Sequence, residues 1–113
     1  MTTPDKVALV VGAQGVIGRN LVEHLATLDD WRIVGLSRRG GASTERITHI
    51  AVDLLDAADT RAKLSELDKV THLFYAAYQD RPTWAELVPP NLAMLINAVD
   101  AIEAASPRLA HIS

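Results

Sequence analysis

The sequence has no cysteine among its 113 residues, so disulfide bonds, thiolate metal ligands and a cysteine nucleophile are excluded. It also has no apolar run close to the roughly 20 residues that a membrane-spanning helix requires. The formal net charge is −3, so the basic excess typical of a general nucleic-acid-binding protein is missing. We therefore expect neither a nucleic acid nor a membrane among its partners.

Signals for export and for metal binding are also missing. Segment 1–6 is polar and has no basic stretch that leads into an apolar one, so we expect no secretory signal. With the absence of cysteine, this fits a reducing compartment, and we expect a cytoplasmic protein. The four histidines lie on separate predicted elements without metal-ligand spacing, and we expect structural or surface roles for them and no metal site: His24, His49, His72 and His111.

Stretches with strand-like and helix-like spacing alternate along the chain, which favours a parallel sheet with helices on its faces. We predict strands at 7–11, 32–37, 47–52, 70–75 and 109–112. We predict helices at 15–28, at 56–67 and between Pro89 and Pro107, because proline suits a first helical turn. The apolar face of the first helix is predicted to hold Ile17, Leu21, Leu25 and Leu28. That of the last is predicted to hold Leu92, Leu95, Ile96, Val99 and Ile102.

A glycine motif, Gly12-x-x-Gly15-x-x-Gly18, joins the first predicted strand to the first helix. The order of strand, glycine turn and helix is typical of a dinucleotide site, and a structural turn is the alternative interpretation. In such a site the glycines permit a tight turn, a close approach of the backbone to a pyrophosphate, and close packing of helix on strand. The helix N-terminus, which includes Val16 and Ile17, then offers free N–H groups to the phosphates.

A basic turn, Ser37-Arg38-Arg39, closes the second predicted strand. An acidic residue about 20 positions after the glycine motif binds the ribose 2′-hydroxyl of NAD in this fold, and Arg38 stands at that position. Two guanidiniums and a hydroxyl bind a 2′-phosphate through charge-assisted hydrogen bonds. The turn therefore predicts NADP as the cofactor, with a solvated basic turn as the alternative.

Two further segments follow predicted strands. Asp53-Leu54 follows the third strand, where a carboxylate can accept from the adenine amino group beside an apolar wall. The alternative is an N-cap or a loop acid for the helix that begins near Asp56. Ala76-Ala77 follows the fourth strand, and small residues there allow the backbone to approach a cofactor. Of the flanking tyrosines, Tyr75 is expected to pack in the core and Tyr78 to border the pocket.

These elements predict a Rossmann-like, doubly wound α/β fold. Because crossovers between parallel strands are right-handed, the expected strand order is 3-2-1-4-5, truncated after strand five. Strand five would then form an exposed edge, since a full doubly wound domain continues further. We expect residues 1–113 to form an NAD(P)-binding Rossmann domain that is the N-terminal part of a longer protein, and we leave a homodimer open as its assembly.

The glycine motif, Asp53-Leu54 and Asn91 resemble the extended branch of the short-chain dehydrogenase/reductase superfamily. Within it, the segments 37–39, 70–75 and 109–113 are most similar to the progesterone 5β-reductase/iridoid synthase-like family. The resemblance implies an oxidoreductase that uses NADPH to reduce the carbon–carbon double bond of an enone. It implies a largely structural role for Asn91, and it places the family's catalytic Lys and Tyr beyond this chain.

Carried over residue by residue, the resemblance assigns Gly12, Gly15, Val16, Ile17 and Gly18 to the pyrophosphate turn. It assigns Arg38 and Arg39 to the 2′-phosphate, and Asp53 and Leu54 to the adenine pocket. The substrate is expected to be a small enone or carbonyl compound. An NADP-dependent sugar-nucleotide epimerase or dehydratase of the same branch stays open as an alternative, as does a non-catalytic NADP-sensing module.

Overall fold

The computed structural model describes residues 6–113; the polar segment in which we expect no secretory signal lies mainly outside them. Five parallel strands form one sheet in the order β3-β2-β1-β4-β5, and the predicted fold class and strand order are confirmed. The strands are β1 (Lys6–Val11), β2 (Trp31–Ser37), β3 (Ile47–Ala51), β4 (His72–Tyr75) and β5 (His111–Ile112). The helices are α1 (Val16–Ala26), α2 (Ala57–Leu64) and α3 (Trp84–Ala105).

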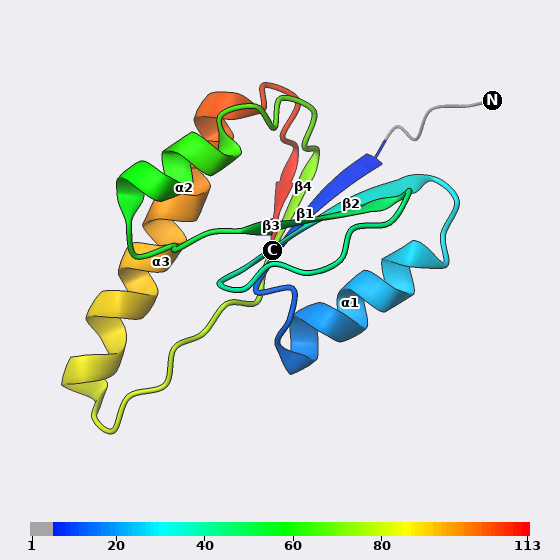
Figure 1. Ribbon diagram of the computed structural model, residues 1–113. Helices are drawn as coiled ribbons and strands as arrows, with labels where there is room; N and C mark the ends of the chain where they lie inside the picture. Colours follow the sequence, from blue (N-terminus) through cyan, green and yellow to red (C-terminus); the bar gives the residue numbers. More distant parts are fainter. Residues whose placement is uncertain (1–5) are drawn as a thin grey trace.

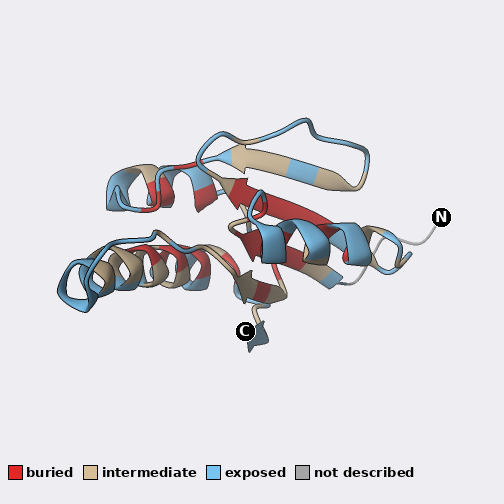
Figure 2. Cartoon of the chain, turned by 90° about the horizontal axis from the view of Figure 1, so that it is seen from below, coloured by how far each residue is buried: buried red, intermediate tan, exposed pale blue. Residues whose placement is uncertain are grey.

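The sheet lies between two helical layers, with α1 on one face and α2 and α3 on the other (Figure 1). Strand β1 is central, and its residues from Ala8 to Val11 are fully buried because both faces of the sheet are covered. Ala8 and Val10 pack with Val22 and Leu25 of α1 on one face of the sheet. Leu9 and Val11 pack on the other face, with buried residues of α2 and α3. Figure 2 shows this burial in the central strands and the exposed connection between β2 and β3.

The buried face of α1 differs from the prediction at one residue. Leu25 is buried and Leu21 and Leu28 pack partly against the core, but Ile17 is 73% exposed and Val22 is buried. The helix begins at Val16, so Ile17 belongs to its first turn. The prediction for Ile17 was wrong because helical spacing does not show where along the helix its contact with the sheet begins.

Helix α3 begins earlier than predicted. Its N-cap is Thr83, whose hydroxyl accepts from the N–H of Glu86 at 3.2 Å, so Pro89 and Pro90 lie inside the helix instead of in its first turn. Thr83-x-x-Glu86 is the spacing of a capping box, a start signal that outweighs the two prolines. Proline removes a backbone donor, but this part of the helix is largely exposed, so the carbonyls that lose a helical partner remain accessible to water.

The buried face of α3 also differs from the predicted stripe. Met94, Ala98 and Ile102 are buried, whereas Leu92 and Ile96 are about half exposed, at 51% and 46%. A helix turns about 100° per residue, so Met94 lies nearly opposite Leu92, and Ala98 lies nearly opposite Ile96. When Met94 and Ala98 face the sheet, Leu92 and Ile96 therefore face away from it.

Within residues 6–113, no helix combines the length and apolar character that crossing a membrane requires.

Candidate nucleotide-binding site

A cleft of about 810 Å³ opens where β1, β2 and β4 end, on the side of the sheet from which α1 starts. Its volume falls within the range of small-molecule and cofactor sites. The lining combines the glycine turn, the basic turn and the segments after β3 and β4. Eleven of the twelve predicted cofactor residues line it: Gly12, Gly15, Val16, Ile17, Ser37, Arg38, Arg39, Asp53, Leu54, Ala76 and Ala77.

The glycine turn is held tightly against its neighbours. Gly12 has a φ of +87°, a region that glycine adopts without strain, and a Cβ there would lie 2.7 Å from the backbone nitrogen of Ala77. The N–H groups of Gly12 and Ala13 both donate to the carbonyl of Leu36 at 2.9 Å. The turn is therefore fixed to β2 on one side and to the segment after β4 on the other. These close neighbours are backbone atoms of Ala76 and Ala77, so the missing side chain of Gly12 permits the approach.

Gly15 and Gly18 differ in what surrounds them. A Cβ at Gly18 would collide with the carbonyl oxygen of Gly12, and Gly18 is buried under the turn. Gly18 is the one predicted cofactor residue that does not line the cleft, because it serves the packing of helix on turn. A Cβ at Gly15 would meet only the oxygen of Gly12, at 3.5 Å, and otherwise faces open space in the cleft.

The N-terminus of α1 faces the cleft without a side-chain cap, because its N-cap is Gly15. Helices α2 and α3, by contrast, are capped by the side chains of Asp56 and Thr83. An uncapped helix N-terminus presents N–H groups and the positive end of the helix dipole. Val16 and Ile17, at 80% and 73% exposure, place apolar surface at the same opening. This arrangement suits an anionic group flanked by apolar surface.

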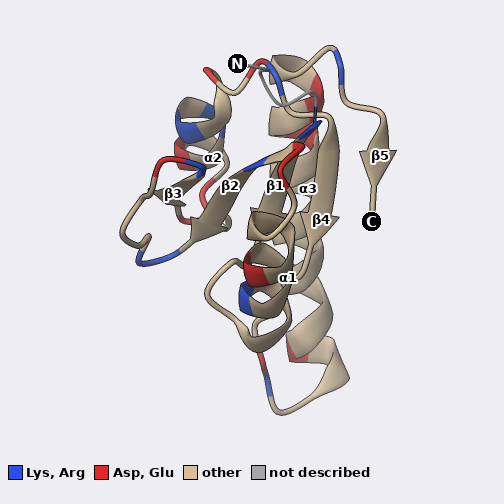
Figure 3. Cartoon of the chain, turned by 90° about the vertical axis from the view of Figure 1, so that its right-hand side faces the viewer, with Lys and Arg blue, Asp and Glu red and all other residues tan. Residues whose placement is uncertain are grey.

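The basic turn is ordered around Gly40, which has a φ of +71°. The Ser37 hydroxyl accepts from the N–H of Gly40 at 2.9 Å and lies 3.2 Å from its carbonyl oxygen. The turn thus projects Arg38 and Arg39, which are exposed and, within residues 6–113, form no ion pair. Figure 3 shows this basic segment between β2 and β3. Both guanidiniums are free to meet an anion in the cleft.

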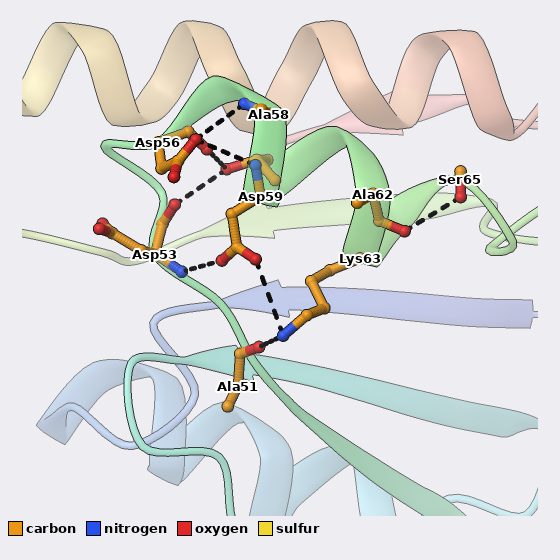
Figure 4. Close-up of polar contacts among 9 residues, drawn as sticks. Ala51, Asp53, Asp56, Ala58, Asp59, Ala62, Lys63 and Ser65 are labelled. Atoms are coloured by element: carbon orange, nitrogen blue, oxygen red, sulfur yellow. Dashed lines mark hydrogen bonds and ion pairs between the residues drawn. The ribbon is translucent and has the colours of Figure 1, made fainter.

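The structure excludes one of the interpretations of Asp53, the helix cap, and leaves it as a loop acid beside the cleft. The N-cap of α2 is Asp56, so the helix-capping interpretation of Asp53 is wrong. The backbone N–H of Asp53 donates to Asp59 at 2.9 Å, and Asp59 lies 3.8 Å from the ammonium of Lys63. The Asp53 carboxylate points away from this network (Figure 4). Among residues 6–113 it accepts only from the N–H of Leu55, at 3.0 Å. An oxygen of Asp53 therefore stays available at the cleft.

The two tyrosines lie where the sequence predicted, one at the cleft and one against the core. Tyr78 is 66% exposed and lines the cleft. Tyr75 packs against the core, where burial raises the pKa of its hydroxyl, and this hydroxyl has no hydrogen-bond partner among the described residues.

Asn91 connects the loop after β4 to α3 through two 2.8 Å hydrogen bonds with the backbone of Gln79, so its role is structural.

Sequence reasoning missed several residues of the cleft. Gln14, Arg19 and Gly40 line it from the two turns and α1, and Gln79 and Met94 line it from the far side. Arg19 could have been predicted as a cleft residue from the sequence, since it follows the glycine motif directly and stands one helical turn after Gly15. Gln79 and Met94 had none, because their approach depends on the packing of α3.

The fold and the cleft together define a Rossmann-like α/β domain, whose cleft lies at the carboxyl ends of parallel strands, on both sides of the point where the strand order reverses. This is the place at which dinucleotides bind in such folds. The family model described as "NAD dependent epimerase/dehydratase family" matches residues 8–113. This chain belongs to that family.

Curated relatives confirm the resemblance seen in the sequence. The (S)-8-oxocitronellyl enol synthase of Nepeta cataria is 40% identical over 115 residues, and the 3-oxo-Delta(4,5)-steroid 5-beta-reductase of Arabidopsis thaliana is 36% identical over the same length. Each match covers 96% of this chain, and the chain spans 30% of the length of either relative.

Solved structures show the same fold. A putative epimerase from Burkholderia cenocepacia J2315 has a TM-score of 0.77 at 22% identity, covering 98% of this chain and 37% of that one. A short chain dehydrogenase from the same organism, solved in complex with NADP, has a TM-score of 0.75 at 19% identity. That match covers 91% of this chain and 50% of the other.

Proposed function

We propose that this chain is the NADP-binding part of an NADPH-dependent reductase that acts on the carbon–carbon double bond of enones. The observation that carries the cofactor choice is the pair of exposed guanidiniums at the end of β2, Arg38 and Arg39, which form no ion pair with any other described residue. A carboxylate at this position would repel a 2′-phosphate, whereas guanidiniums bind one in charge-assisted hydrogen bonds.

The remaining residues fit the other parts of a dinucleotide. The glycine turn and the uncapped N-terminus of α1 suit the pyrophosphate, since Gly15 leaves open space where a side chain would stand. Asp53 offers a carboxylate oxygen to the adenine amino group, beside the apolar wall of Leu54. In this proposal Ser37 both orders the basic turn and faces the 2′-phosphate.

The reaction class rests on the relatives. Both the enol synthase and the steroid 5-beta-reductase match this chain over nearly its whole length. NADPH, when bound, would supply a hydride to the β-carbon of the enone. The residues of this chain would bind and orient the cofactor, while the groups that stabilise the resulting enolate are expected outside residues 1–113.

Titration calorimetry on the intact protein tests the cofactor assignment. NADPH is expected to bind more tightly than NADH, and Arg38→Ala is expected to cost about 1.5–3 kcal/mol of NADPH binding with little change for NADH. Arg108→Ala, an exposed arginine outside the cleft, is the matched control. Equal losses for both cofactors in Arg38→Ala would refute the 2′-phosphate role.

The family description names NAD-dependent epimerases and dehydratases, which supports a second candidate. In our proposal this candidate is an NADP-dependent enzyme that acts on sugar nucleotides. The intact protein is assayed for NADPH oxidation with 2-cyclohexen-1-one and, in parallel, for conversion of nucleotide sugars. Enone-dependent oxidation supports the reductase. Conversion of a nucleotide sugar without enone turnover selects the second candidate, and tight NADPH binding without either reaction selects a cofactor-sensing module.

A further inference from the structure

Gln14 connects the two turns that meet in the cleft. It stands inside the glycine turn, and its side-chain Nε2 donates to the carbonyl of Gly40 at 3.1 Å. That same carbonyl lies 3.2 Å from the hydroxyl of Ser37, and the residues between Ser37 and Gly40 are the two arginines of the basic turn. Among residues 6–113, Gln14 makes the one side-chain hydrogen bond between the glycine turn and the basic turn.

The space beside Gly40 is shaped around this amide. A Cβ at Gly41 would lie 2.6 Å from Nε2 of Gln14 and 3.2 Å from the ring of His49, although the backbone of Gly41 is not in the left-handed region. The nearest obstacles to a side chain at this position are therefore the Gln14 amide and the His49 ring, and not the turn conformation. The backbone carbonyl of Gln14 also accepts from the guanidinium of Arg19 at 3.3 Å.

We infer that Gln14 is a positioning residue that sets the preference for NADPH over NADH, by holding the basic turn against the glycine turn. The inference rests on the proposed function and names no contact between Gln14 and the cofactor. Within the part of the chain that the structure describes, the side chains of Arg38 and Arg39 make no hydrogen bonds, so their positions depend on how firmly the turn beneath them is held. A loosened turn must be ordered again when a 2′-phosphate binds, and that ordering costs affinity.

Two substitutions are designed to remove the hydrogen bond between Gln14 and the Gly40 carbonyl, one in the glycine turn and one beside Gly40. Gln14→Met keeps the size of the side chain and removes the donor, and Gly41→Ala pushes the amide away from Gly40 without a strained backbone. Each is expected to weaken NADPH binding roughly three- to tenfold, the range of one net hydrogen bond, and to change NADH binding less than about twofold. The double variant is expected to lose no more than either single variant, because both remove the same interaction.

The measurements are NADPH and NADH titrations of the intact protein, with thermal unfolding of each variant. Asn20→Met, an exposed amide on α1 outside the cleft, is the matched control and is expected to change neither affinity. Equal loss for both cofactors, no loss, or additive losses in the double variant would overturn the inference.

Failure of this inference is distinguishable from failure of the proposed function. If Arg38→Ala removes the NADPH preference while Gln14→Met keeps it, the cofactor assignment stands and the role of Gln14 is overturned. If the unsubstituted protein does not distinguish NADPH from NADH, the cofactor assignment is overturned, and the role of Gln14 with it.

Discussion

Gly15 and Gly18 are expected to respond differently when each receives a methyl group, because their surroundings differ. Gly18→Ala is expected to destabilise the fold, because the new Cβ meets the backbone of Gly12. Gly15→Ala is expected to leave the fold nearly intact, because its Cβ meets a single atom at an ordinary 3.5 Å. The same Gly15 methyl projects into the cleft and is expected to weaken both dinucleotides alike.

The magnitude for Gly18→Ala follows from the rigidity of what it meets. The Gly12 carbonyl already accepts from the N–H of Gly15 at 3.1 Å, and the N–H of Gly12 is bonded to Leu36, so the turn has little room to move. Overpacking of this kind costs about 3 kcal/mol, and the better helix propensity of alanine offsets about 1 kcal/mol. In a domain of about 100 residues each kcal/mol shifts Tm by about 4 °C, so the net loss of about 2 kcal/mol corresponds to a fall of roughly 8 °C in Tm.

Calorimetric unfolding and cofactor titration of both variants form the assay. Gly15→Ala is expected to lose no more than about 1 kcal/mol of stability, since alanine is a poorer N-cap than glycine. Gly15→Val, with a larger side chain, is expected to abolish binding of NADPH and NADH while the protein stays folded. Normal NADPH binding by a folded Gly15→Val variant would show that the motif is only structural, and an unchanged Tm for Gly18→Ala would refute the packing argument.

Two further predictions concern the helices and the sheet. Asp56→Ala removes the side-chain cap of α2 and is expected to cost about 1 kcal/mol of unfolding free energy, measured by urea denaturation; no loss would contradict the capping role. Burial, with the neighbouring His111 and Lys6 as further causes, lowers the pKa of His72 below 6.5, so the unfolded chain binds this proton more readily and stability falls as the pH drops from 6.5 through the folded pKa. Thermal unfolding across this range is expected to show a smaller fall in His72→Phe, and an identical fall in both proteins would contradict the assignment.

The sheet and most of the cleft were predictable because their signals are local. The apolar run of β1, the glycines after it and the arginines after β2 follow one another at the spacing that a parallel strand–turn–helix unit imposes. Once right-handed crossovers fix the strand order, the segments after β1, β2, β3 and β4 must meet at one edge of the sheet. The predicted residues therefore converged without any knowledge of side-chain contacts.

The errors and omissions have a common origin in tertiary packing. Helical spacing identified apolar residues in α3 but not which of them face the sheet, so Leu92 and Ile96 were placed on the wrong side. The start of α3 was missed because Pro89 was taken as its first turn, although the spacing of Thr83 and Glu86 is that of a capping box. Gln14 could not be recognised, because its partner Gly40 is 26 residues away in the chain.

The placement of the basic turn has a consequence for how this domain can evolve. Arg38 and Arg39 are exposed and contribute nothing to either core cluster, while the strands that carry the turn are buried. Surface substitutions away from packing and caps usually change stability by no more than about 0.5 kcal/mol. Substitutions that remove or reverse the charge at Arg38 and Arg39 are therefore expected to be tolerated by the fold, whereas the close-packed glycine turn tolerates few changes.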